Sequence, residues 1–208
     1  MNGTIRQIRR GARLLVAAVM LFPLTGLPAQ AEQDDLRPVS DFAAIADSTA
    51  RAQAIFVEIT RVLHHPRCLN CHTLTDRPFQ GEDGHAHIPR VTRGESGFGV
   101  PGMYCNSCHR PANYHGMPGN PTWVMAPASM GWTGFSAAEI CLQLKDRSRN
   151  GDRSLEDIHH HVMEDHLLAY SWNPPAHLES APGSRDSLGA LFRAWIDAGA
   201  ACPPMEDE

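Results

Sequence analysis

Apolar residues recur at every third or fourth position in several stretches of the chain, as in a helix that buries one face. The first stretch runs from Ser40 to Leu63 and must end by Pro66, because proline disfavours helical backbone in the residue before it. Asp47 and Ser48 interrupt the pattern and can cap a new segment. We therefore expect helical structure over residues 40–63, divided near residue 47.

Three further helices are expected, at residues 136–144, 154–167 and 187–198. Ser136 and Glu139 have the spacing of a capping box, in which each side chain bonds the backbone N–H of the other residue. Gly199 follows the last apolar stripe and favours a left-handed cap at that end.

Residues 73–134 are rich in glycine and proline and have little periodicity. A loop of that length ordinarily counts against a compact domain. The chain contains no pattern typical of a parallel sheet. The expected fold class is mostly α with long irregular loops.

The pattern Cys-x-x-Cys-His occurs twice, with starts 37 residues apart. The first motif contains Cys68, Cys71 and His72, and the second contains Cys105, Cys108 and His109. The pattern is the attachment signal for a c-type haem. Two thiols at this spacing can bond the two vinyl groups of one porphyrin, and the histidine can bind its iron. We expect two covalent haems, which would supply the apolar mass that the loop lacks, packed together in one cytochrome c-like unit.

Two other uses of these cysteines remain open. The four thiols could form a four-cysteine zinc site, because paired Cys-x-x-Cys knuckles are typical of zinc. A single Cys-x-x-Cys could also be a redox-active dithiol. Neither accounts for a histidine directly after both pairs, so haem is the preferred interpretation.

The distal iron ligands are less clearly encoded, because ten histidines lie outside the motifs. We expect His87, between the motifs, and Met130, in a proline-flanked segment, with His161 as the alternative. A distal histidine or methionine makes a six-coordinate, electron-carrying haem, whereas an open position permits catalysis at iron. Aromatic side chains of the loop could line the porphyrins or simply anchor the chain: Phe79, Phe98, Tyr104, Trp123 and Trp132.

The first 31 residues have the features of a secretory signal peptide. Four arginines precede an apolar run from Leu14 to Leu27, and Ala29-Gln30-Ala31 is a small-x-small cleavage site. Cleavage after Ala31 would leave residues 32–208 as one dihaem domain in the periplasm. No later hydrophobic run is long enough to span a membrane.

Loss of those four arginines leaves 14 basic residues against 23 acidic ones, a net charge near −9. This negative net charge disfavours a nucleic-acid partner and favours a redox protein that docks through a basic face.

Cys141 and Cys202 remain outside the motifs. In an oxidising compartment we expect them to form a disulfide.

Several stretches of the sequence together resemble a known family. They are residues 65–72, 91–94, 119–123, 126–127 with 130–132, 140–146 and 195–203. Together they resemble a family of exported cytochrome c-like proteins labelled as isoquinoline oxidoreductase subunits. The likeness extends from about Leu36 to Pro203. It implies an electron-transfer partner for a periplasmic molybdenum hydroxylase that oxidises N-heterocycles or aldehydes.

The leading hypothesis is therefore a non-catalytic electron carrier between such an enzyme and the respiratory chain. A dihaem enzyme of the peroxidase type, with one open iron, is the first alternative. A zinc-binding structural protein is the second.

Overall fold

The computed structural model describes residues 35–205, so the expected signal peptide lies outside the described residues. The α-helices are α1 (Ser48–Leu63), α2 (Pro66–Leu69), α3 (Ala137–Lys145), α4 (Leu155–Glu164), α5 (His166–Ala169) and α6 (Arg185–Asp197). The 3-10 turns are η1 (Val39–Phe42), η2 (Cys105–Ser107), η3 (Ala128–Met130) and η4 (Tyr170–Trp172). Two antiparallel ribbons pair β1 (Phe79–Gln80) with β2 (His85–Ala86), and β3 (Gly99–Val100) with β4 (Met103–Tyr104). The prediction of a mostly helical chain is confirmed.

Local capping signals determine where the helices begin and end. The carboxylate of Asp47 accepts a hydrogen bond from the N–H of Ala50 at 2.7 Å and starts α1. Both halves of the expected capping box of Ser136 and Glu139 are present at the start of α3. At the end of α6, Gly199 has a φ of +98°, the left-handed conformation that terminates a helix with a Schellman motif.

Two expected boundaries differ from the structure. The first part of the 40–63 stretch forms only η1, because the α-helix starts at its cap, Asp47. The expected helix over residues 154–167 is divided at Asp165, which has an extended backbone and caps α5 with its side chain. Apolar spacing continues through this break, so periodicity alone does not reveal it.

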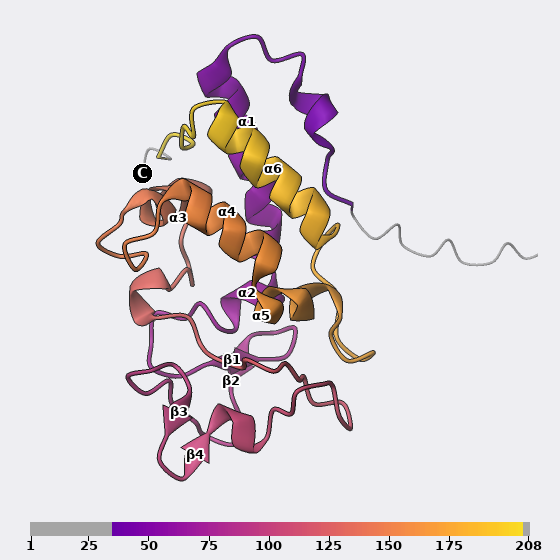
Figure 1. The fold of residues 1–208 in the computed structure, drawn as a ribbon, viewed down its shortest axis with the longest axis vertical. Coiled ribbons are helices and arrows are strands. Elements are labelled where there is room, and N and C mark those ends of the chain that lie inside the picture. Colours follow the sequence, from indigo (N-terminus) through magenta and orange to yellow (C-terminus); the bar gives the residue numbers. More distant parts are fainter. Residues whose placement is uncertain (1–34, 206–208) are drawn as a thin grey trace, which may run out of the picture. The chain divides into compact units, whose positions relative to one another are not determined.

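The hydrophobic core lies between α1 and α6, which run side by side, with α3 and α4 packed against them (Figure 1). The fully buried rings of Phe56 on α1 and Trp195 on α6 are 4.9 Å apart between centroids. Phe192 adds an edge contact to Trp195. This core positions α2, which begins the first Cys-x-x-Cys-His motif, at the end of α1.

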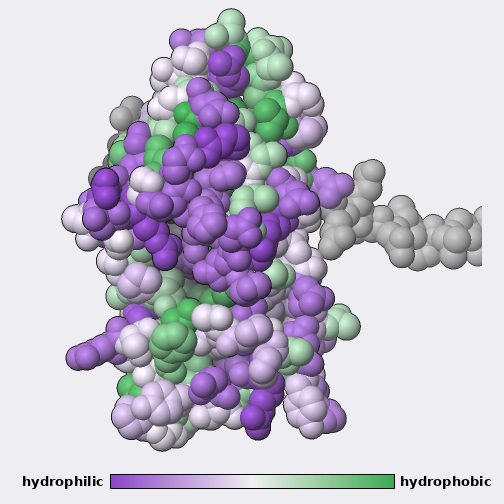
Figure 2. Space-filling view, in the orientation of Figure 1, coloured by the Kyte–Doolittle hydropathy of each residue, from purple (hydrophilic) through white to green (hydrophobic). Residues whose placement is uncertain are grey.

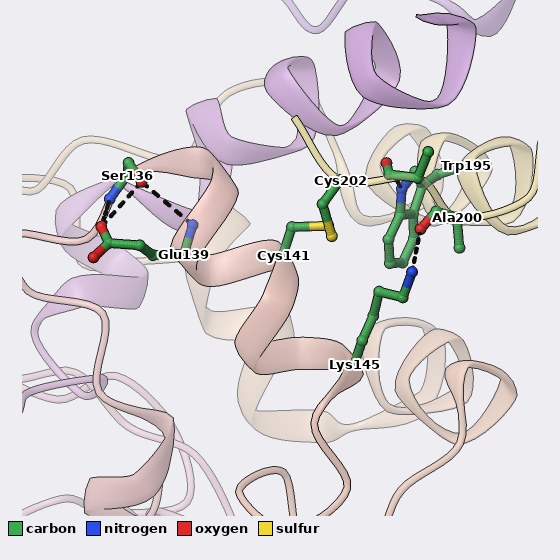
Figure 3. Close-up of a disulfide and its surroundings, with 8 residues drawn as sticks. Ser136, Glu139, Cys141, Lys145, Trp195, Ala200 and Cys202 are labelled. Carbon is green, nitrogen blue, oxygen red and sulfur yellow. Dashed lines mark hydrogen bonds between the residues drawn. A yellow bond between two sulfur atoms is a disulfide. The ribbon is translucent and has the colours of Figure 1, made fainter. Parts of the chain in front are cut away.

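The expected disulfide is present between Cys141 on α3 and Cys202, with a Cα–Cα distance of 5.6 Å. Figure 3 shows that the segment after α6 is also held by two hydrogen bonds near this disulfide. Lys145 Nζ donates to the carbonyl of Ala200 at 2.7 Å, and Trp195 Nε1 donates to that of Ala201 at 3.0 Å. The disulfide and the Lys145 hydrogen bond tie the C-terminal segment to α3, and the Trp195 hydrogen bond ties it to α6.

The segment between α2 and α3 contains the two short ribbons and the second motif. It has few regular hydrogen bonds, as its glycine and proline content predicts. Figure 1 shows this segment gathered at the end of α1 that leads into α2. Among residues 35–205, no helix has both the length and the hydropathy needed to cross a membrane.

Candidate haem sites

The two Cys-x-x-Cys-His motifs form the same tight turn. In each, the N–H groups of the second cysteine and of the histidine donate to the carbonyl of the first cysteine. These distances are 3.1 and 3.0 Å to Cys68, and 3.2 and 2.9 Å to Cys105. The turn places both thiols and the imidazole on one short segment, as covalent haem attachment requires.

The thiols of the first motif are partly buried and protonated. Burial raises the pKa of Cys68 to about 12 and that of Cys71 to about 11. Redox-active dithiols have lowered thiol pKa values instead, so this environment disfavours the dithiol interpretation. Cys105 contributes to the raised pKa of Cys71, which indicates that the two motifs are neighbours in space.

Two contacts orient the imidazole of His72. Its Nδ1 donates to the carbonyl of Met130 at 2.7 Å, and its ring stacks on Trp132 with centroids 3.5 Å apart. Burial lowers the pKa of His72 to about 4, against the opposing effect of the Met130 carbonyl. The ring is therefore neutral with its proton on Nδ1, which leaves Nε2 free to bind a metal.

His109 is held by the same kind of contacts. Its Nδ1 donates to the carbonyl of Pro118 at 2.8 Å, and its ring stacks on Trp123 with centroids 4.0 Å apart and planes 4° from parallel. Burial lowers the pKa of His109, opposed by the Pro118 carbonyl. Nε2 of this second motif histidine is likewise available to a metal.

A glycine follows each acceptor carbonyl, and both glycines lie against backbone. A Cβ on Gly131 would lie 2.7 Å from the carbonyl oxygen of Thr73, and one on Gly119 would collide with the carbonyl of Ala112. In the amino-acid sequence, internal repetition is limited to the two Cys-x-x-Cys-His motifs. The structure adds a repeated support of carbonyl, glycine and stacked tryptophan behind each motif histidine.

His87 faces the histidine of the second motif. The rings of His87 and His109 have centroids 6.0 Å apart, at 61°. Two imidazoles that bind one metal ion at about 2 Å each have ring centres about 6 Å apart, so the separation fits a shared iron. His87 Nδ1 donates to the carbonyl of Pro89 at 3.0 Å, which leaves its Nε2 free as well.

His161, on α4, is an electrostatic neighbour of His72 and helps to lower its pKa. Its Nδ1 bonds the carboxylate of Asp165 at 3.0 Å. A carboxylate on Nδ1 is a common way to orient a metal-binding imidazole through its other nitrogen. Asp165 is thus a supporting residue that sequence analysis missed, although its four-residue spacing from His161 on a helix could have indicated it.

The structure does not bring Met130 to the expected distal position. Its backbone carbonyl bonds Nδ1 of His72, so this residue lies behind the imidazole, on the side away from Nε2. Its side chain is 8% exposed and packs in the hydrophobic core with Trp132. Met130 therefore helps to hold His72, through its backbone carbonyl.

The four motif cysteines do not converge on one point. In residues 35–205, the sole group of three or more side chains with ligand atoms within 4.8 Å of one another is His65, Glu82 and Glu179. This finding disfavours the four-cysteine zinc site. His65 Nδ1 accepts the N–H of Arg67, and Glu82 pairs with the same arginine at 2.8 Å, so this group is a hydrogen-bonded cluster around a cation.

Arg67 connects the two motifs through aromatic contacts that sequence analysis missed. Its side chain is 1% exposed, and it donates to the hydroxyl of Tyr170 at 3.0 Å. The ring of Tyr170 meets Trp123 edge-on, with centroids 5.2 Å apart. Trp123 in turn stacks on His109.

Apolar side chains are exposed around the second motif. Of the eleven exposed large hydrophobic residues in the described part of the chain, six fall within residues 88–117: Ile88, Phe98, Met103, Tyr104, Tyr114 and Met117. In Figure 2 the surface over α4 is hydrophilic, and hydrophobic surface is visible over the segment with the short ribbons. Such a concentration of apolar surface is typical of a site that a large apolar group or a partner covers.

The residues present fit two covalently attached haems. Each site has paired thiols on a turn, a neutral imidazole with a free Nε2, and a second histidine nearby. Of the expected aromatic residues, Trp123 and Trp132 stack directly on the motif histidines.

Comparisons of this chain with protein-family models, with curated proteins and with solved structures found no match.

Proposed function

We propose that residues 32–208 form an exported dihaem c-type cytochrome that carries electrons in the periplasm. The observation that carries this proposal is the pairing of two identical Cys-x-x-Cys-His turns with imidazoles whose Nδ1 protons are donated to carbonyls. A chance Cys-x-x-Cys-His sequence has no reason to acquire this support twice. A bound haem supplies one-electron redox chemistry at its iron.

The chain itself sets the coordination of each iron. His109 and His87 would hold the iron at the second motif, and His72 and His161 would hold the iron at the first. Carbonyls or a carboxylate on all four Nδ1 atoms increase the basicity of the ligands and orient them. With two histidines for each haem, neither iron would keep an open position, which favours a carrier over a peroxidase-type enzyme.

Spectroscopy of the ferric protein tests this assignment. We expect only low-spin signals, reversible one-electron reduction of both haems, and no reaction with hydrogen peroxide. A high-spin component that reacts with peroxide would contradict the carrier and indicate an enzyme of the peroxidase type. Bound zinc without iron would contradict both.

The proposed partner is a redox protein. Because the cytochrome is acidic, we expect the partner to dock through a basic face. The resemblance to cytochrome subunits of isoquinoline oxidoreductases makes a periplasmic molybdenum hydroxylase the proposed electron donor. Capture of partners by the mature protein from periplasm, with reduction of the haems by the purified partner and its substrate, tests this step.

Substitution of Gly131 should alter the haem at the first motif alone. In Gly131→Ala, the new methyl group would push the Met130 carbonyl away from His72, because Thr73 blocks it. Loss of this hydrogen bond makes the imidazole a weaker donor, so the reduction potential of one haem should rise. A redox titration measures the effect.

Gly134→Ala is the matched control, because a Cβ there meets no atom within 4 Å. It costs backbone strain but should leave both potentials unchanged. Wild-type potentials in Gly131→Ala would refute the role of this support.

A further inference from the structure

Arg93 is a buried cation beside the first motif. It is 5% exposed, and its guanidinium donates to the carbonyls of Thr75 at 2.7 Å and Thr73 at 2.9 Å. Thr73 directly follows the motif histidine, His72. Arg93 also influences the pKa values of Cys71 and His72, so its charge lies close to both.

This cation lacks a carboxylate partner within the part of the chain that the structure describes. The buried arginines of residues 35–205 are Arg67 and Arg93. Arg67 pairs with Glu82 at 2.8 Å, whereas no carboxylate of these residues is within ion-pair distance of Arg93. Burial lowers the pKa of Arg93, and the nearby Asp76 opposes this only in part. A buried charge normally has a counter-charge, because removal from water is unfavourable.

Hydrogen-bond donors near the same histidine are also unused. Arg93 Nε is buried without a partner, and so is Nε1 of Trp132, which stacks on His72. Buried donors in native proteins nearly always have acceptors, so these two donors beside an uncompensated charge indicate an acceptor that the polypeptide does not supply. A carboxylate matches both the missing charge and the missing acceptor, because it can accept a charge-assisted hydrogen bond from the unpartnered Nε of Arg93.

We propose that Arg93 binds a propionate carboxylate of the haem at the first motif and is its counter-ion. The inference rests on the proposed function, since it requires a haem at that motif. A cation next to the porphyrin disfavours the ferric state, which carries one more positive charge than the ferrous state. Arg93 thereby raises the reduction potential of this haem relative to the other.

The test is redox titration of the holoprotein as wild type, Arg93→Gln and Arg93→Lys. Arg93→Gln should shift the ferric–ferrous equilibrium of one haem by roughly tenfold towards ferric, a fall of about 59 mV for a one-electron couple. Arg93→Lys retains the charge and should shift it much less. Resonance Raman spectra should show a changed propionate band in both variants, because lysine cannot reproduce the planar fork.

Arg51→Gln is the matched control. Arg51 is a partly buried arginine that donates to the carbonyl of Ile45, at the other end of α1 from the first motif. Both potentials should be unchanged in this variant.

Unchanged potentials in Arg93→Gln, with two haems bound, would overturn the inference. So would equal shifts in Arg93→Gln and Arg93→Lys, because the effect would then be structural. If Arg93→Gln yields no holoprotein, the Raman comparison of wild type with Arg93→Lys decides, and an identical propionate band overturns the inference. A wild-type protein without haem would instead refute the proposed function.

Discussion

Replacement of His87 by alanine is expected to convert the haem at the second motif from low-spin to high-spin ferric iron. The His87 and His109 rings are 6.0 Å apart between centroids, the separation that two imidazoles on one iron require. Without His87, the iron at the second motif would be held by His109 alone, whereas the iron at the first motif would keep both of its histidines. About half of the low-spin signal should therefore disappear, and one haem in two should bind carbon monoxide. Electron paramagnetic resonance and visible absorption measure these changes.

His85→Ala is the matched control for this variant. His85 lies two residues earlier, on β2, and its exposed side chain bonds Asp83 at 2.6 Å. This substitution should leave both haem spectra unchanged. A fully low-spin spectrum in His87→Ala would eliminate His87 as a ligand. At the first motif, His161→Ala should produce the corresponding change, whereas Met130→Leu should not.

Removal of the disulfide should cause the largest loss of stability. The double variant Cys141→Ser, Cys202→Ser opens a connection between residues 61 apart in sequence. The chain entropy released in the unfolded state corresponds to about 4 kcal/mol for a loop of this length. This is a large share of the free energy of unfolding of a typical domain, which is about 5–15 kcal/mol.

Denaturant titration of the holoproteins at equal haem content measures this difference. Hydrogen bonds of Lys145 and Trp195 should still hold the segment after α6, so the variant should keep the wild-type haem spectra. The wild-type protein under reducing conditions is a second measurement of the same effect. A loss below about 1 kcal/mol would mean that the disulfide adds little to the other contacts of this segment.

The helical part of the fold was predictable because its signals are local. Asp47, Ser136 and Gly199 act within one helical turn, and the structure contains each cap where the sequence predicts it. The disulfide was predictable by elimination, since the motifs account for the other four cysteines. The division at Asp165 was missed, because apolar spacing is the same on both sides of it.

The candidate sites were predictable only as far as the motifs themselves. The supporting carbonyl of His72 lies far away in sequence, since Met130 is 58 residues from it, whereas Pro118 is nine residues from His109. Their segment has no periodicity, so tertiary contacts alone determine which carbonyl or ring reaches which imidazole. For the same reason, sequence analysis could propose His87 and Met130 as ligands but could not assign either to a motif.

The intact mass of the protein purified from the periplasm tests the central claim most directly. We predict a polypeptide that starts at residue 32 and carries two covalent haems, with one haem lost in the double variant Cys105→Ser, Cys108→Ser. A colourless protein with the mass of the bare polypeptide would contradict it.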